Sequence, residues 1–151
     1  MNNKPNLLWI TWNIISAILG IIVLISLVDD ILVWKAFIPN IIEAYRNIVH
    51  FPFRLLRLDI AGILIDSLFI GSLVGLSLSK SLNTQGVQAI GVFIAALFLW
   101  PISLLYLTFS LFAGKFSGEK NEVNEELKAA YWSAAIILGF IFILLLNTFL
   151  L

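Results

Sequence analysis

Four long apolar stretches constrain this chain more than any other feature of its sequence. They cover residues 7–28, 60–79, 87–113 and 129–151, and Asp66 is the one charged residue within them. The hydrocarbon core of a bilayer is about 30 Å thick, and an α-helix crosses it in roughly 20 residues. Backbone groups in lipid need hydrogen bonds within their own segment, which a helix provides. We therefore predict an all-α integral membrane protein with four transmembrane helices, forming a single membrane domain over residues 1–151.

The composition supports this fold class and excludes several kinds of site. Hydrophobic residues make up 61% of the chain, whereas soluble domains contain about 45–50% apolar residues. The formal net charge is zero, which argues against direct binding to nucleic acid. Cysteine is absent and His50 is the single histidine, so the sequence excludes disulfides, thiolate metal sites and histidine clusters. We expect no metal and no cofactor.

The sequence also lacks the common enzyme motifs. It contains no nucleophile elbow, no phosphate-binding glycine loop and no HExxH motif, and no Ser/His/Asp set can be assembled around its one histidine. We therefore expect a protein that is not an enzyme.

The basic residues indicate an orientation for the helices. Seven of the nine lysines and arginines fall in the connections 29–58 and 114–128, and the other two are Lys4 and Lys80. By the positive-inside rule, both connections are predicted to be cytoplasmic and both termini to face outward. This layout is expected of a multi-pass protein of the inner (cytoplasmic) membrane.

The first connection is apolar but is interrupted by two prolines. Between Pro39 and Pro52 the sequence predicts an amphipathic helix that lies in the membrane surface, with an elbow at Pro52 leading into the second span. Its predicted apolar face consists of Ile41, Ile42, Tyr45, Ile48 and Val49, and its polar face of Asn40, Glu43, Arg46, Asn47 and His50. Arg46, Arg54 and Arg57 either contact lipid headgroups, including anionic ones, or act as ordinary topology anchors.

The connection 114–128 is acidic. Its glutamates are Glu119, Glu122, Glu125 and Glu126. Asn121 is a suitable N-cap for a helix that begins in water and continues into the last span. The acidic segment is either a solvated helix start, where negative charge is favourable, or a docking site for a basic cytosolic protein.

Asp66 is the most informative single residue, because a charged side chain inside a bilayer costs several kcal/mol and usually faces the bundle interior. Asp59 lies seven residues earlier, on the same face of a continuous helix. The two acids could line one side of a functional cavity, or Asp66 could have a structural role. The candidate partners in the structural role are Asn13, Ser16, Tyr106 and Arg57.

Small residues form a stripe along the second span. Ser67, Gly71, Gly75 and Ser79 recur at every fourth position. Small side chains let two helix backbones approach closely in a membrane. The stripe therefore predicts tight packing, either within the chain or between the subunits of a homo-oligomer.

Two further features of the spans predict how their helices pack. Pro101 should kink the third span, either as a static bend or as a gating hinge. The hydroxyls predicted to satisfy the carbonyls that it frees are those of Ser103, Tyr106, Thr108 and Ser110. Asn13 and Asn147 lie at comparable depth if the four spans alternate in direction, which predicts a hydrogen bond between them.

In its organisation, the chain resembles the small four-span inner-membrane subunits of bacterial anti-phage defence systems, such as the Kiwa KwaA-like proteins. The shared features are four spans, short outer parts and polar material concentrated in the connections 29–58 and 114–128. The resemblance implies a membrane sensor that works with a separate cytosolic effector, with the coupling located in these two connections.

These observations lead to one main hypothesis and two alternatives. The main hypothesis is a homo-oligomeric, non-enzymatic membrane subunit that senses membrane state or recruits a cytosolic protein partner, in phage defence if the resemblance holds. The first alternative is a small ion channel or proton-coupled transporter that uses Asp66. The second is a membrane-permeabilising toxin or holin-like pore.

Overall fold

The computed structural model describes residues 7–81, 85–112 and 125–149, and all regular structure within them is helical. The helices are α1 (Leu7–Leu27), α2 (Ile38–Val49), α3 (Phe51–Leu55), α4 (Gly62–Ser81), α5 (Val87–Phe112) and α6 (Glu125–Phe149). Four of them, α1, α4, α5 and α6, are long and apolar enough to cross a membrane. They match the four predicted stretches to within a few residues, except that α6 begins earlier, at Glu125. Residues Glu119, Asn121 and Glu122 lie outside the described ranges.

The surface of the four long helices is apolar. Between 17% and 39% of each spanning segment is buried inside the protein, and large side chains such as Phe98, Phe109 and Phe142 are more than 60% exposed. Soluble monomers rarely expose contiguous apolar patches of more than a few hundred Å². This distribution supports the prediction that the helices are surrounded by lipid.

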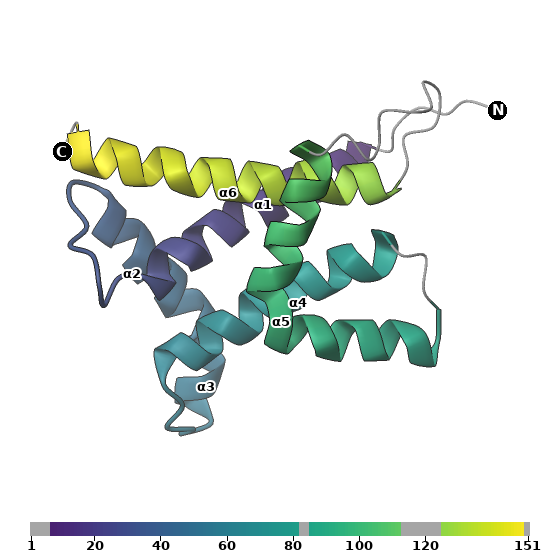
Figure 1. The fold of residues 1–151 in the computed structure, drawn as a ribbon. Coiled ribbons are helices and arrows are strands. Elements are labelled where there is room, and N and C mark those ends of the chain that lie inside the picture. Colours follow the sequence, from purple (N-terminus) through teal and green to yellow (C-terminus); the bar gives the residue numbers. More distant parts are fainter. Residues whose placement is uncertain (1–6, 82–84, 113–124, 150–151) are drawn as a thin grey trace.

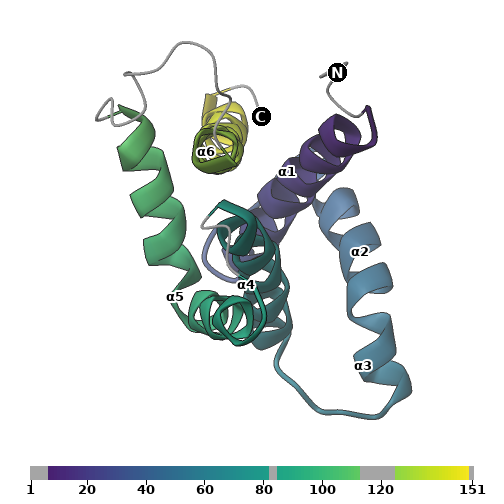
Figure 2. The ribbon, with the colours of Figure 1, turned by 90° about the vertical axis from the view of Figure 1, so that its right-hand side faces the viewer.

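The core lies where α1, α4 and α6 meet, with the first half of α5 against α4. Val23, Ile70, Val74 and Ile136 have no solvent exposure and belong to one buried cluster. Figure 2 shows α6 end-on, with α4 and α1 packed beside it. The long helices therefore form a small bundle around a dry aliphatic centre.

The small-residue stripe of α4 packs within the chain. A Cβ atom on Gly71 would lie 2.9 Å from the Cα and the carbonyl oxygen of Leu97, and one on Gly75 would lie 2.8 Å from the ring of Phe93. The absence of both side chains lets α4 and α5 approach each other closely. At these two glycines of the stripe, the closely packed partner is α5 of the same chain.

α5 is bent in its middle, as Pro101 predicted. Leu99 has non-helical backbone angles of φ −110° and ψ 25°, and beyond it the second half of α5 runs across α6 (Figure 1). Pro101 has no N–H for the carbonyl of Leu97, four residues earlier. Thr108 and Ser110 donate to carbonyls of their own turns, Leu104 and Tyr106, so they do not satisfy the carbonyl that Pro101 frees.

The bend in α5 determines the relative direction of α1 and α6. Gly20 packs against Ile136 and Ile21 packs against Gly139, and the side chain of Asn147 bonds to the backbone just after α1. Both helices therefore run in the same direction (Figure 1). Four spans that alternate would make α1 and α6 antiparallel, which is what the predicted Asn13–Asn147 bond required. That bond is absent because Asn147 instead donates to Val33 O and accepts from Lys35 N.

The helix expected between the two prolines is α2, which packs against one end of the bundle. Ile38 and Ile42 are buried against Ile25 and Trp34, and partly buried side chains of α6 complete this second cluster. Ile41 and Ile48, assigned to the same apolar face in the sequence, are 38% and 75% exposed. The predicted elbow is instead the short helix α3, followed by a non-helical segment that leads to α4.

Candidate functional site

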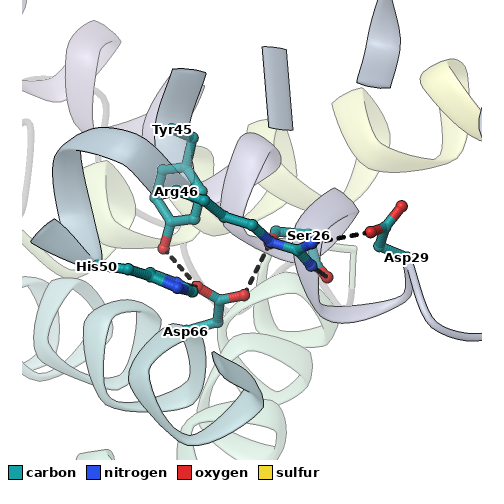
Figure 3. A network of polar contacts seen from close by, with 6 residues as sticks. All are labelled: Ser26, Asp29, Tyr45, Arg46, His50 and Asp66. Atoms are coloured by element: carbon teal, nitrogen blue, oxygen red, sulfur yellow. Dashed lines mark hydrogen bonds and ion pairs between the residues drawn. The ribbon is translucent and has the colours of Figure 1, made fainter. Parts of the chain in front are cut away.

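A buried carboxylate connects α1, α2 and α4. Asp66, the fifth residue of α4, is 1% exposed and accepts hydrogen bonds on both oxygens (Figure 3). Its Oδ2 accepts from Ser26 Oγ at 2.7 Å, and its Oδ1 accepts from Tyr45 Oη at 2.9 Å. His50 Nε2 lies 2.8 Å from the same Oδ1. The acid is thus held by three side chains from outside its own helix.

Two of these partners come from α2, and local sequence explains their placement. Pro39 occupies the first turn of α2, where its missing N–H leaves no helical hydrogen bond unmade. Tyr45 follows Ile38 and Ile42 on the buried stripe of α2. His50 is the C-cap of α2, and its backbone N–H donates to Arg46 O. The buried face of α2 therefore ends in a phenol and an imidazole that meet Asp66.

Arg46 extends the network toward the surface. Its Nε donates to Ser26 Oγ at 3.0 Å and its Nη2 to Ser26 O at 3.1 Å. Its Nη1 forms an ion pair with Asp29 Oδ2 at 3.0 Å. Arg46 and Asp66 thus share one hydroxyl, which links the surface ion pair to the buried acid (Figure 3).

The electrostatic environment keeps Tyr45 neutral. Burial raises the pKa of the Tyr45 phenol well above its usual range, and the charge of Asp66 and the hydrogen bond to it raise the pKa further. A neutral phenol can donate its proton to the carboxylate, as the 2.9 Å contact requires. Tyr45 also contacts the rings of His50 and Phe69 edge-on, each with a centroid distance of 6.0 Å. These contacts fix the phenol in place on the carboxylate.

A cleft of about 380 Å³ lies beside this network. Its lining residues are Asp29, Pro39, Ile42, Glu43, Arg46, Asn47 and Arg54. Arg46 and its ion-pair partner Asp29 belong to both the cleft and the network, whereas Asp66 does not line the cleft. Any ligand in the cleft would therefore meet Arg46 and not the buried carboxylate.

Several expectations about Asp66 are corrected by the structure. Its hydrogen-bond partners are Ser26, Tyr45 and His50, and none of the four partners expected from the sequence contacts it. His50, assigned to the polar face of α2, is 6% exposed. The expectation failed because it placed α2 in the membrane surface, whereas α2 packs on the bundle and brings Tyr45 and His50 to the acid.

Asp59 does not pair with Asp66. It is exposed in the non-helical segment before α4, which begins only at Gly62, so the seven-residue spacing places the two acids on no common helix face. One signal in the sequence could have found the correct pair. The single histidine and the single intramembrane acid lie near each other in the chain, and a buried acid needs a donor.

The remaining site candidates are scattered. Arg54 lines the cleft, whereas Arg57 is exposed and has a positive φ of 53°. Ser67 and Ser79, at the ends of the small-residue stripe, are partly buried. Glu125 and Glu126 form the start of α6, at the end of this helix that lies away from α2 (Figure 1).

Among the residues that the structure describes, no group of three or more His, Cys, Asp or Glu side chains is arranged to hold a metal. Comparison of the chain with family models, curated proteins and solved structures finds no match. Functional inference therefore depends on the geometry of the site.

Proposed function

We propose that the protein is a non-enzymatic membrane subunit in which α2 senses the state of the membrane surface and Asp66 transmits the position of α2 to the bundle. The observation that carries this proposal is the origin of the partners of Asp66. Tyr45 and His50 both belong to α2 or its C-cap. Moving α2 would therefore remove two of three donors from a carboxylate inside the bundle.

The exposed face of α2 is suited to contact lipid. Ile41 and Ile48 project away from the bundle and are seven residues apart, so they share one side of the helix. An amphipathic helix in the interface responds to lipid packing and curvature, because its binding depends on the apolar area that it buries. A change in lipid packing at the surface would thus alter the balance between lipid and bundle contacts of α2.

The same geometry favours a coupling role for Asp66 over ion conduction. The carboxylate accepts from Ser26, Tyr45 and His50 and lies apart from the cleft. An acid that conducts protons needs access to a water path. A carboxylate saturated by donors from two other helices acts as a latch, since separating it from them leaves buried polar groups unsatisfied.

A distance measurement tests the latch. Spin labels at residues 48 on α2 and 141 on α6 would report the position of α2, because Ile48 and Ile141 are both exposed. In bilayers of different acyl-chain length, we expect a shift in the distance for the wild type. Asp66→Ala should broaden the distribution in every bilayer. Ser72→Ala, which removes a hydroxyl bonded within α4, is the matched control and should behave as the wild type.

The proposal fails if Asp66→Ala leaves the distance distribution narrow and unchanged. It also fails if the wild-type distances are identical in all bilayers, because a sensor must differ between the states it distinguishes.

We also propose a revised orientation in the inner membrane. Parallel packing of α1 and α6 would put the Leu7 end of α1 and the Phe149 end of α6 on opposite faces of the membrane, with α2 and the start of α6 also on opposite faces. The contacts Gly20–Ile136 and Ile21–Gly139 support this arrangement. It separates α2 from the start of α6, so these two elements would not form the joint cytoplasmic surface expected from the sequence.

Cysteine labelling distinguishes the two orientations without background, since the chain has no cysteine. We expect single cysteines at Gln85 and Lys128 to be labelled from the same face of intact vesicles, and one at Asn47 from the other. Alternating spans predict that Lys128 is labelled together with Asn47, and that result would reject the revised orientation.

A further inference from the structure

The cleft beside Arg46 has the properties of a binding site for a phospholipid headgroup. One face of α2 contributes Pro39, Ile42, Glu43, Arg46 and Asn47, which recur at helical spacing, and Asp29 and Arg54 complete the lining. Its volume of about 380 Å³ falls within the range of roughly 300–1,000 Å³ that is usual for small-molecule sites. We propose that it binds the headgroup of a zwitterionic aminophospholipid, with a phosphate and a primary ammonium group.

The charges in the cleft match such a headgroup. Two arginines, Arg46 and Arg54, face two acids, Asp29 and Glu43, so the lining is balanced in charge. A cleft selective for anionic lipid would carry an excess of basic residues. The balance therefore favours a ligand with one group of each sign over the anionic lipid expected from the arginines alone.

The binding groups are available in the described part of the chain. Asp29 and Arg46 are already paired with each other at 3.0 Å. Glu43 and Arg54 are exposed and make no side-chain hydrogen bond or ion pair within the described residues. The guanidinium of Arg54 can bind phosphate oxygens through two parallel N–H groups, and the carboxylate of Glu43 can accept from an ammonium.

The location of the cleft fits a lipid more closely than a soluble metabolite. Asp29 lies two residues after the end of the apolar helix α1, so the cleft opens where the bundle would leave the hydrocarbon layer. Pro39 and Ile42 supply an apolar part of the lining, which can contact the glycerol and the first carbons of the acyl chains. A primary ammonium is favoured over a quaternary one because only the former donates hydrogen bonds to Glu43.

This inference deepens the proposed function, on which it rests for the position of α2 at the membrane surface. Arg46 donates to the same Ser26 hydroxyl that donates to Asp66. A phosphate that drew Arg46 into the cleft would weaken its bonds to Ser26. Headgroup binding would thereby affect the hydrogen-bond network of Asp66, although the ligand does not touch Asp66 itself.

Lipid retention tests the site. Purified full-length protein is exchanged into mixed micelles with equal amounts of phosphatidylethanolamine, phosphatidylcholine and phosphatidylglycerol, and the bound lipids are measured by native mass spectrometry. We expect phosphatidylethanolamine to be retained preferentially. Glu43→Gln should reduce this preference by about tenfold, the effect of losing one charged hydrogen bond to the ammonium. Arg54→Gln should instead reduce the retention of all three lipids by about tenfold, because all three carry the phosphate. Arg57→Gln, which removes an exposed arginine outside the cleft, should leave the preference and the retention unchanged.

Equal retention of the three lipids by the wild type would overturn the inference, as would a preference that survives Glu43→Gln. Soluble phosphoethanolamine provides a second measurement on unmodified protein. It should displace the lipid more effectively than glycerol phosphate, and the reverse order would reject the headgroup assignment. Saturable binding of phosphoethanolamine alone, without lipid preference, would point to a soluble metabolite and also count against the proposal. Lipid retention and the spin-label distances are separate measurements. Failure of the latch would appear in the distances, whereas failure of the lipid site would appear in the retention.

Discussion

Replacing Asp66 with alanine should destabilise the docked position of α2 more than any other single change in the network. The substitution removes the acceptor for Ser26 Oγ, Tyr45 Oη and His50 Nε2. Polar contacts between membrane helices contribute roughly 0.6–2 kcal/mol each, and removing one partner of a buried charged pair costs about 3–5 kcal/mol. Three contacts at about 1 kcal/mol each reach the lower end of that range, so we expect a loss of about 3 kcal/mol.

Substitutions of single donors measure how much each contact of Asp66 contributes to this loss of stability. Tyr45→Phe removes one donor while His50 stays 2.8 Å from the same oxygen, so it should cost about 1 kcal/mol. The double variant with Asp66→Ala should cost less than the sum of the two, because both remove the same contact. Ser72→Ala changes a hydroxyl bonded within α4 and should stay within about 0.5 kcal/mol of the wild type.

The assay is reversible unfolding in micelles by added denaturing detergent, followed by tryptophan fluorescence. Trp34 is buried in the cluster that holds α2, so its emission reports the loss of that packing. The argument for a hub at Asp66 would be refuted if Asp66→Ala cost no more than Tyr45→Phe, or if the two effects were simply additive.

Three further predictions concern the packing of α4 on α5, the pH dependence of stability, and the contacts of Asn147 with the segment after α1. Gly71→Ala should destabilise the protein by about 1–3 kcal/mol in the same assay, because the new Cβ meets the α5 backbone, whereas Gly91→Ala should be neutral or stabilising, since nothing lies within 4 Å. Folding raises the pKa of the Tyr45 phenol above its ordinary value of about 10. The neutral phenol therefore contributes its full stability to the folded state below about pH 10, and this contribution is lost as the pH rises further. Wild type but not Tyr45→Phe should therefore lose this stability in a denaturation series above that pH. Asn147→Ala should cost about 1–2 kcal/mol by removing its bonds to the segment after α1, measured as faster hydrogen exchange at the amide of Lys35.

The glycine at the start of α4 leaves room for the ring of His50 beside Asp66. Gly62, at the start of α4, lies close to the imidazole, and a Cβ there would be 3.2 Å from His50 Cε1. The absence of a side chain at this position lets the ring lie over the first turn of α4 and reach the carboxylate. The histidine and the glycine therefore act together in placing α2 on the bundle.

The sequence alone determined which segments form the long helices and which of them are apolar enough for lipid. Length and hydropathy are local properties of the chain. Three other features are local too: the bend at Pro101, the helix between Pro39 and Pro52, and the close approach allowed by Gly71 and Gly75. These features follow from rules that act within one segment or along one face of a helix.

Only the tertiary structure decided the direction of α6 and the partners of Asp66. The direction of α6 depends on how far α5 turns after Leu99, an angle that local sequence does not specify. Packing against α6 determines this angle, through the contact of Ser133 with Thr108 and Leu104. Once α1 and α6 run in parallel, Asn147 meets the segment after α1 instead of Asn13. The partners of Asp66 depend on where α2 packs, which is against Ile25, Trp34 and α6. The buried carboxylate then bonds to the nearest donors, Tyr45 and His50. An unsatisfied charge in that position would cost more than any alternative contact of these two residues.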